Sequence, residues 1–409
     1  MWVILRLLIG IAILFAAEFY FINRINFATK RFFQKFYEGK YRLIRKIFLI
    51  WINLYPLFLI FLFTYFGITG SYLTSPESWI TDYLLIYPFW IAFILMIQCF
   101  LFIIPLHLIK FLASAIFKKR KETFAKALSV FTFIIVGFFM LYIPIRVIYD
   151  YNIVEVREVT YKTKNLSASL ENFKIGFISD LQADHYTDKA RLSKFINTVN
   201  SLNPELILIA GDLITTGPDY IKLSGEEVGK LKAKYGVYSC VGDHDNWAYR
   251  NDYAKSRSEV EASLKANNVE MVDNGMRKIK VDSAEIEITF ITNTYVQTVP
   301  KNILDSLTAI QNSDLKIFLA HQPRPFLIKA AQKHNYNLYL AGHTHGGQIT
   351  FVFPFIQLTP TMFETSYTKG DFWFGNTLMI VTRGLGMSLA PIRYNSTPEV
   401  TLITLINSK

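Results

Sequence analysis

The chain has 409 residues and an apolar composition, with 35 Phe, 23 Tyr and a mean hydropathy of +0.26. Its length is sufficient for two domains, and its composition indicates that part of it is embedded in a membrane. Its two cysteines, Cys99 and Cys240, do not form the pattern of a disulfide framework and give no information about the redox compartment. The net charge of +11 is compatible with nucleic-acid binding, so the location of the basic residues decides its meaning.

The basic residues are concentrated in two segments. Residues 24–46 and 110–126 together hold fourteen Lys or Arg and two Glu, which gives a net charge of +12. The remainder of the chain is therefore close to neutral, which argues against a basic surface for nucleic acid. Basic segments placed between apolar stretches instead indicate the orientation of a membrane protein.

Four apolar stretches fill the first 150 residues, and each has the roughly 20 residues needed to cross the hydrocarbon core of a bilayer. They are Trp2–Ile22, Ile47–Ile68, Tyr83–Ile109 and Ser129–Tyr149. The basic segments join the first stretch to the second and the third to the fourth, whereas the loop Thr69–Asp82 has no Lys or Arg. By the positive-inside rule, the basic segments are cytoplasmic and the chain after Tyr149 is extracytoplasmic. We predict a four-helix transmembrane anchor over residues 1–150 of a multi-pass cell-membrane protein, and not a cleaved signal peptide.

Short strands alternate with polar helices after Asp150, which is the pattern of a layered α/β domain over residues 151–409. The expected strands are Val154–Lys162, Phe173–Asp180, Leu206–Asp212, Gly236–Gly242, Met276–Val281, Glu285–Thr292, Leu315–His321, Tyr336–Leu340, Thr377–Thr382 and Val400–Leu405. The expected helices are Asp188–Leu202, Glu226–Lys234, Ser256–Asn267 and Arg324–His334. Because several strands end in a polar residue, we expect a site at the carboxyl edge of the sheet.

Five of the strand ends carry acids or histidines. They are Asp180-x-Gln182, Gly211-Asp212, Gly242-Asp243-His244-Asp245, His321 and Gly342-His343-x-His345. Two imidazoles at positions i and i+2 of an extended backbone point the same way, and the adjacent glycines allow a charged ligand to approach. Carboxylates and imidazoles without thiolates suit Mn, Fe or Zn. Their number exceeds the four ligands of one tetrahedral ion, which indicates two ions.

In this order, the motifs resemble those of the calcineurin-like metallophosphoesterases, which carry Asp-x-His, Gly-Asp, Gly-Asn-His-Asp/Glu, His and Gly-His-x-His. The resemblance covers about Asn172 to Ile406, and the closing segment from Arg383 to Leu402 resembles the membrane-anchored YkuE-type branch. It implies a four-layer α/β/β/α metallophosphoesterase sandwich with a dinuclear metal site. It also implies two ligand sets, Asp180, Gln182, Asp212 and His345 for one ion, and Asp212, Asp243, His321 and His343 for the other.

Two positions depart from the family pattern. Gln182 stands where histidine is usual, and its carbonyl oxygen is a neutral and weaker ligand than imidazole for Zn or Fe. Asp243 stands where asparagine is usual and adds a negative charge at the second ion. Since one departure weakens a site and the other strengthens one, we expect both metals to be retained. His185 is an alternative source of the missing imidazole.

Two further pairs of residues have predicted roles. His244, oriented by Asp245, is expected to protonate the leaving group of a phosphoester; the alternative is that it holds a metal ligand in place. Arg383 and Arg393 are candidates for binding the substrate phosphate, since the guanidinium group of arginine matches phosphate geometry. The alternative is that they form surface salt bridges.

We therefore predict a membrane-anchored phosphoesterase with two divalent metal ions, Mn, Fe or Zn. The segment Phe351–Phe374 is rich in Phe and Pro and is either packed core or an aromatic lip that suits a lipid-like phosphoester. The predicted substrate is a phosphorylated lipid or envelope precursor, membrane lipids are the other predicted partners, and nucleic acid is not a partner; the sequence does not specify an oligomeric state. The alternatives are a nucleotide-sugar-lipid pyrophosphatase and a metal-poor binding or scaffold protein, which Gln182 and Asp243 would suit.

Overall fold

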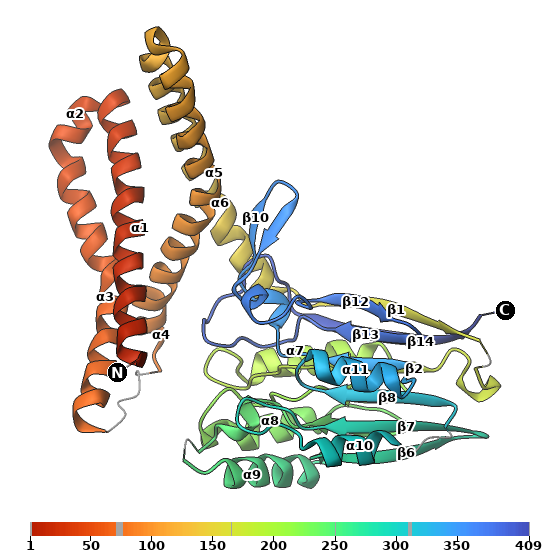
Figure 1. The fold of residues 1–409 in the computed structure, drawn as a ribbon. Coiled ribbons are helices and arrows are strands. Elements are labelled where there is room, and N and C mark those ends of the chain that lie inside the picture. The colour runs from red at the N-terminus through yellow and green to blue at the C-terminus, as the bar shows by residue number, and fades with distance from the viewer. Residues whose placement is uncertain (1, 71–76, 165, 250, 310–312, 409) are drawn as a thin grey trace. The chain divides into compact units, whose positions relative to one another are not determined.

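The computed structural model describes most of the chain, namely residues 2–70, 77–164, 166–249, 251–309 and 313–408 (Figure 1). It has two compact units. The helical unit comprises Met1–Ile148 and Phe351–Gln357, and the sandwich unit comprises Tyr149–Thr350 and Leu358–Lys409. Residues 71–76 of the predicted extracytoplasmic loop Thr69–Asp82 lie outside the described residues.

Among the described residues of the helical unit, four helices are long and apolar enough to cross a membrane. The helices of this unit are α1 (Trp2–Phe32), α2 (Gln34–Phe36), α3 (Arg42–Thr69), α4 (Trp79–Thr81), α5 (Tyr87–Ile116) and α6 (Lys121–Asn152). Each long helix continues from its apolar stretch into a basic segment, because Lys and Arg are good helix formers. The last turn of α6 belongs to the sandwich unit, where Thr397 Oγ1 donates to the buried carboxylate of Asp150 at 2.6 Å.

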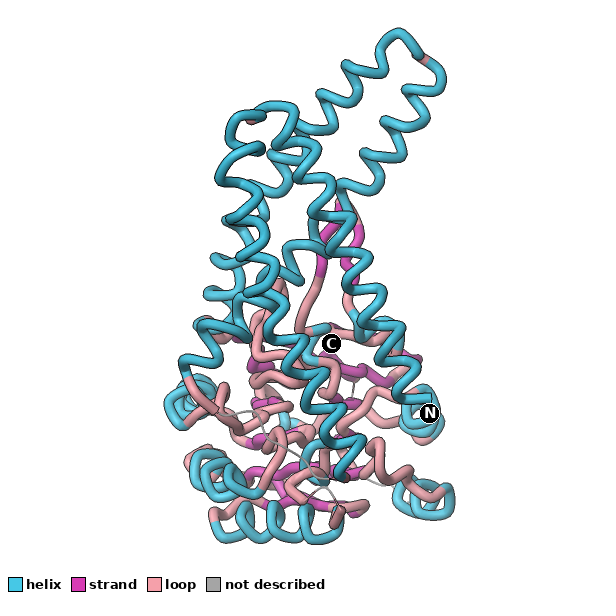
Figure 2. The backbone as a smooth tube through the Cα atoms, turned by 90° about the vertical axis from the view of Figure 1, so that its left-hand side faces the viewer, coloured by secondary structure: helices cyan, strands magenta, loops and turns pink. Residues whose placement is uncertain are grey.

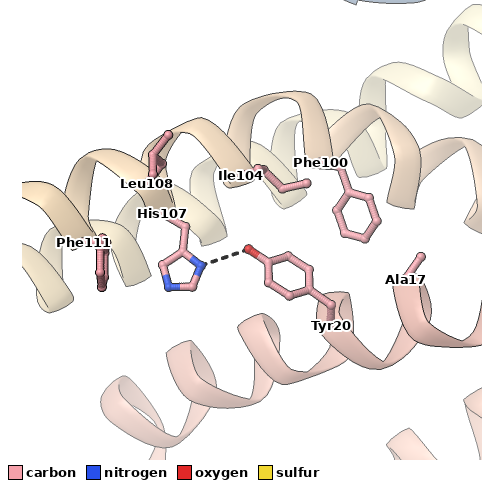
Figure 3. Close-up of a pocket in the computed structure, with 7 residues that line it drawn as sticks. All are labelled: Ala17, Tyr20, Phe100, Ile104, His107, Leu108 and Phe111. Atoms are coloured by element: carbon pink, nitrogen blue, oxygen red, sulfur yellow. Dashed lines mark hydrogen bonds between the residues drawn. The ribbon is translucent and has the colours of Figure 1, made fainter. Parts of the chain in front are cut away.

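A groove of about 490 Å³ lies between α1 and α5 in the helical unit (Figure 3). Apolar side chains line most of it, namely Ala17, Phe100, Ile104, Leu108 and Phe111. The hydroxyl of Tyr20 lies 3.1 Å from His107 Nδ1, a contact drawn as a dashed line in Figure 3. Arg24 Nη1 lies 3.4 Å from His107 Nε2. These polar side chains of α1 and α5 therefore interact with one another.

Two six-stranded sheets form the core of the sandwich unit. The first has the order β1 (Glu155–Thr163), β14 (Glu399–Asn407), β2 (Lys174–Ile178), β3 (Leu206–Ile209), β4 (Val237–Cys240) and β5 (Glu270–Val272). The second has the order β12 (Gly370–Phe374), β13 (Thr377–Val381), β9 (Leu338–Ala341), β8 (Leu315–Ala320), β7 (Ala284–Ile291) and β6 (Gly275–Val281). Strands β2, β3 and β4 are parallel, as are β7, β8 and β9, so their carboxyl ends share one edge of each sheet.

Strand β3 shows how a continuous apolar run builds two layers. Leu206 and Leu208 face the other sheet and join the core between the two sheets. Ile207 and Ile209 point to the opposite face and join the core beneath the helices. A parallel strand that is buried on both faces requires apolar residues at every position, which explains the sequence Leu-Ile-Leu-Ile.

Helices cover the outer face of each sheet, which completes four layers. The first sheet packs against α7 (Lys189–Ser201), α8 (Ile221–Val228) and α9 (Tyr253–Ala266). The second sheet packs against α10 (Lys301–Ala309) and α11 (Pro325–Lys333). Figure 2 shows these helices on either side of the strands. The predicted α/β/β/α sandwich preceded by four long apolar helices is confirmed.

The first and last strands of the sandwich pair with each other. Strand β1 follows α6 directly and runs parallel to β14, from Glu155 opposite Glu399 to Thr163 opposite Asn407. Strand β14 also pairs with β2 in the antiparallel sense. Strand β14 is thus inserted between the first two strands of the sandwich, and β1 forms the edge of the sheet.

After Asp150, four described strands and one described helix are not predicted from the sequence. They are β5, β10 (Phe351–Phe353), β11 (Ile356–Leu358), β12 and α10. Three of these strands have only three residues, which is too short for a periodic pattern. Helix α8 ends at Val228 and does not run to Lys234 as predicted. The following Gly229 packs so closely on Asn267 that a Cβ would clash, and the chain turns there.

Candidate metal centre

The acidic and imidazole side chains predicted to bind metal follow strands at the shared carboxyl edges. These residues are Asp180 after β2, Asp212 after β3, Asp243 after β4, His321 after β8 and His343 after β9. The two sheets meet here through His321, because its Nδ1 donates to the carbonyl oxygen of Ala210 at 2.6 Å. Sheet topology therefore gathers residues that are far apart in the sequence.

Two overlapping groups of side chains could each hold a metal ion. The groups are Asp180, Asp212 and His321, and Asp243, His321 and His343, and the ligand atoms of each group lie within 4.8 Å of one another. His321 Nε2 lies 3.3 Å from Asp212 Oδ2 and 3.3 Å from Asp243 Oδ2. His321 is therefore common to the two groups.

The remaining predicted ligands, Gln182 and His345, lie beside the first group. Gln182 Nε2 donates to Asp212 Oδ2 at 2.8 Å, whereas Gln182 Oε1 is buried without a hydrogen-bond partner among the described residues. His345 Nε2 lies 3.5 Å from Asp180 Oδ1. The structure thus brings all seven predicted ligands into one cluster. His185 packs on Tyr186 instead and belongs to neither group of described residues.

The backbone of this cluster adopts a conformation that is rare outside glycine. Five of the predicted ligands have positive φ angles, namely Asp180 (55°), Gln182 (52°), Asp212 (59°), His343 (72°) and His345 (50°). This left-handed conformation costs a non-glycine residue about 1–2 kcal/mol. Such strain persists where the surrounding structure fixes it, and it concentrates at functional sites.

Glycines allow the strand ends to approach one another. A Cβ on Gly242 would clash with the backbone nitrogen and carboxylate of Asp212. A Cβ on Gly342 would clash with Ser179 and lie 2.6 Å from Asp180 Oδ2. Gly242 and Gly342 are therefore needed for close packing of the carboxylates.

Hydrogen bonds fix the orientation of both imidazoles. Because a carbonyl oxygen only accepts, His321 Nδ1 carries the hydrogen and Nε2 faces the carboxylates. His343 Nε2 lies 3.0 Å from Glu364 Oε1, and its Nδ1 lies 2.9 Å from Asp243 Oδ2. In each ring, one nitrogen contacts an outer acceptor and the other faces the cluster, as in metal-binding histidines.

This donor set fits divalent cations, because buried carboxylates need compensating positive charge. Protons provide it in the metal-free protein. Burial opposes a charge on His343, but hydrogen bonds with Asp243 and Glu364 outweigh this and raise its pKa to about 9. Burial also raises the pKa of Asp180. A cation can replace these protons, and Oε1 of Gln182 is a further available oxygen ligand.

His244 lies beside the cluster and is oriented by Thr215. Its Nδ1 donates to the carbonyl oxygen of Thr215 at 2.6 Å, and its Nε2 lies 3.1 Å from Ser388 Oγ. The backbone N–H of His244 donates to Asp212 Oδ1 at 2.8 Å. The ring can therefore exchange a proton at Nε2, while the main chain of the same residue holds Asp212.

Asp245 has different partners from those predicted. Its carboxylate accepts backbone N–H groups from Asp212, Leu213 and Gly242 at 2.7–3.0 Å. His244 and Asp245 are consecutive residues of a short 3₁₀ helix, so their side chains point in different directions. Burial and the charge of Asp212 raise the pKa of Asp245 to about 6. Asp245 thus connects two loops of the site, and Thr215 orients His244.

Arg383 and Arg393 are both held within the fold. Arg383 forms ion pairs with Glu399 at 2.7 Å and Glu155 at 2.6 Å. Arg393 is buried and donates to four backbone carbonyls, those of Arg383, Gly386, Ser396 and His345. Its Nη2 also lies 3.3 Å from His345 Nδ1. Burial and this cation lower the pKa of His345 well below its usual value. Substrate binding by either arginine stays a prediction.

Several residues around His343 and Asp243 are not found by sequence reasoning. Glu364 Oε1 accepts from the hydroxyl of Tyr295 at 2.7 Å and from Arg324 Nη2 at 2.6 Å. Asp243 accepts from Gln322 Nε2 at 2.7 Å and from the backbone N–H of Tyr295 at 2.6 Å. The available signal for Glu364 is that it is the first charged residue after the histidine pair.

A four-layer sandwich with carboxylates and imidazoles gathered at the common sheet edge is the arrangement expected of a metal-dependent hydrolase. Residues 173–347 match the family model described as calcineurin-like phosphoesterase. The metallophosphoesterase YkuE of Bacillus subtilis (strain 168), described as uncharacterized, is 30% identical over 257 residues, which cover 62% of this chain and 86% of that protein.

A transmembrane protein with metallophosphoesterase domain from Danio rerio is 26% identical over 262 residues, which cover 61% of this chain and 57% of that protein. A solved dimetal phosphatase from Danio rerio is 10% identical, with a TM-score of 0.32, over 57% of this chain and 99% of that chain. The chain belongs to the calcineurin-like metallophosphoesterases, in the YkuE-type branch, and is a metal-dependent phosphoric ester hydrolase.

Proposed function

We propose that this protein hydrolyses a phosphorylated lipid or envelope precursor on the extracytoplasmic side of the cell membrane. Four long apolar helices, with basic segments between the first and second and between the third and fourth, support this location and orientation. The corresponding organisation is a transmembrane anchor over residues 1–150 and a hydrolase domain over residues 151–409.

The observation that carries the proposal is the convergence of three buried carboxylates on His321. We propose that one ion is held by Asp180, Gln182, Asp212 and His345, and the other by Asp212, Asp243, His321 and His343. The unpaired Oε1 of Gln182 and the strained backbone of the ligands support this assignment. Oxygen and imidazole ligands suit manganese, iron or zinc.

Two divalent ions bound here would lower the pKa of water and neutralise phosphoryl oxygens. The residues of the chain would orient the metal ligands and supply a proton to the leaving group. Glu364 and the carbonyl of Ala210 hold the rings of His343 and His321, so their free nitrogens point into the cluster. His244 can accept a proton at Nε2 and give it to the leaving oxygen, because the Thr215 carbonyl keeps a hydrogen on Nδ1 and leaves Nε2 to exchange the other.

The test uses the full-length protein in lipid nanodiscs, loaded with manganese, iron or zinc. Its substrates are an aryl phosphate, a phosphatidate, a polyprenyl phosphate and a nucleotide-sugar lipid. We expect release of inorganic phosphate from a lipid monoester, and loss of that release in Asp212→Asn. If only the nucleotide-sugar lipid is cleaved, the protein is a pyrophosphatase and the assignment of a lipid monoester is wrong. Turnover of the aryl phosphate without turnover of any lipid would overturn the lipid assignment.

A second candidate function is a metal-poor scaffold with the same fold. It is favoured by Gln182, which uses its amide N–H on Asp212, and by the cation of Arg393 beside His345. The discriminating measurement is the metal content of the purified full-length protein. Less than one bound ion per chain and no turnover after addition of manganese would support the scaffold, whereas two ions and turnover would exclude it.

A further inference from the structure

The hairpin formed by β10 (Phe351–Phe353) and β11 (Ile356–Leu358) is separate from both six-stranded sheets. Residues Phe351–Gln357 belong to the helical unit, although the chain before and after them belongs to the sandwich unit. Figures 1 and 2 show the hairpin alongside the long helices. The hairpin is therefore part of the region whose helices can cross a membrane.

Gln98 of α5 binds the hairpin through both ends of its side-chain amide. Its Nε2 donates to the carbonyl of Val352 at 2.6 Å, and its Oε1 accepts from the N–H of Val352 at 3.0 Å. The amide thus satisfies the two backbone groups that a neighbouring strand would satisfy. One turn further along α5, Phe102 packs on Phe353 with 5.2 Å between the ring centroids.

The composition of the hairpin is unsuited to water. Residues 346–363 contain no charged side chain, and Phe355 and Ile356 at the tip are exposed. An isolated two-stranded hairpin is marginally stable in water, and exposed strand edges are normally protected by charges. This hairpin has no such charges, so its composition matches an apolar environment.

We propose that the hairpin Phe351–Leu358 is immersed in the acyl-chain region of the bilayer, with Phe355 and Ile356 against lipid chains. Hydrocarbon tolerates backbone N–H and C=O groups only when they are paired, and Gln98 provides such a pair in the middle of a candidate membrane-spanning helix. The need for that pairing explains a buried amide in an otherwise apolar stretch.

The hairpin connects directly to the metal centre in the sequence. It begins six residues after His345, and Thr359 at its base donates to the carbonyl of Gly347 at 2.7 Å. The loop that carries His343 and His345 therefore continues into the lipid-facing hairpin. This inference rests on the membrane location given under Proposed function and adds a second contact with lipid besides the helices.

The test measures the depth of single nitroxide labels in the full-length protein in nanodiscs. The label is placed at Phe355→Cys, with Leu141→Cys on α6 as the membrane control and Leu389→Cys in the sandwich unit as the aqueous control. All three side chains are exposed, and the native Cys99 and Cys240 are buried, so the unsubstituted protein is the labelling blank. We expect preferential collision with oxygen at positions 355 and 141, and with a water-soluble nickel complex at position 389.

The control positions distinguish failure of the hairpin proposal from failure of the proposed membrane location. If position 141 prefers oxygen and position 355 prefers the nickel complex, the hairpin proposal is overturned while the membrane anchor stands. If position 141 also prefers the nickel complex, the membrane location under Proposed function fails, and this inference fails with it.

A second variant tests the role of Gln98. Gln98→Leu leaves both backbone groups of Val352 unpaired, so the label at position 355 should become more mobile and lose oxygen accessibility. The matched control is Ser129→Ala, because buried Ser129 donates to Ala125 of its own helix at 3.0 Å. A signal from position 355 that is unchanged in Gln98→Leu would overturn the assignment of Gln98 as the partner of the hairpin.

Discussion

The two sides of the metal centre differ in how their ligands are supported. On the side of Asp243, the carboxylate receives hydrogen bonds from Gln322 and the backbone of Tyr295, and Glu364 contacts the ring of His343. On the other side, Gln182 is neutral and His345 lies beside the buried guanidinium of Arg393. The first side has more negative charge and more outer hydrogen bonds.

This difference predicts that the two proposed ions bind with unequal affinity. Burial opposes ionisation of Asp243, but contacts with His321 and His343 outweigh it and lower the pKa of this carboxyl well below its usual value. The side of Asp180 instead contains a neutral amide, and a positive charge adjoins His345. We expect the ion on the side of Asp243 to bind first, and the second ion to limit activity.

The largest effect is expected at Asp212, the residue that we propose to bind both ions. Asp212→Asn should lower kcat/KM about 10³-fold, equivalent to about 4 kcal/mol, because Asp212 contacts Gln182, His321 and the backbone of His244. The measurement is phosphate release, with circular dichroism as a check of folding. The control Asp188→Asn preserves the cap of α7 and should leave activity unchanged. Activity of Asp212→Asn within tenfold of the unsubstituted protein would contradict its assignment.

The second prediction concerns the pH dependence of metal affinity on the side of Asp243 and His343. The pKa of His343 is raised to about 9, so the protonated ring stabilises the metal-free protein below its unfolded pKa of about 6.5, and this contribution is lost as pH rises through 9. A metal must displace that proton. Metal affinity should therefore rise about tenfold per unit between pH 7 and 9, as measured by calorimetric titration. Glu364→Gln should flatten this rise, and an equal slope in the variant would contradict the role of Glu364.

The third prediction concerns a substitution that weakens metal binding on the side of Asp243. Asp243→Asn removes one negative charge but keeps the shape of the side chain, so affinity for the first ion should fall about 10- to 100-fold. Because asparagine is the residue that the family pattern has here, hydrolysis at saturating metal should persist. Metal titration followed by phosphate release separates these effects. Unchanged affinity would show that the charge of Asp243 does not contribute to metal binding.

The smallest effect is expected from strengthening the weaker side. Gln182→His introduces an imidazole in place of the amide, so affinity for the second ion should rise about tenfold. The measurement is the number of ions retained after dialysis against a weak chelator. Gln182→Asn, which keeps the amide on a shorter side chain, is the control and should not increase retention. If Gln182→His retains no additional ion, the two sides do not differ for the reason given above.

The sequence is sufficient to anticipate residues that follow strands. Asp180, Asp212, Asp243, His321 and His343 each come after an apolar run, and parallel strands bring their ends to a common edge. The alternation of strands and helices predicts a layered α/β domain, because burial of a strand face or a helix stripe depends on local spacing. The four layers are implied only by the family resemblance, and the four membrane helices are predicted from the length of their apolar stretches.

The supporting residues cannot be anticipated in this way. Glu364, Tyr295 and Gln322 lie in loops, and their contacts with the ligands depend on tertiary packing. Asp245 is adjacent to His244 in sequence, yet its carboxylate accepts from backbone groups of two other loops. Adjacency along the chain is therefore a poor guide to contact at a turn.

The position of β14 has a consequence for biosynthesis. Because β14 lies between β1 and β2, the first sheet remains incomplete until β14 has been translated. A nascent chain would expose the edges of both strands to proteases and to neighbouring chains. A chain that stops before β14 therefore lacks the strand that pairs with both β1 and β2.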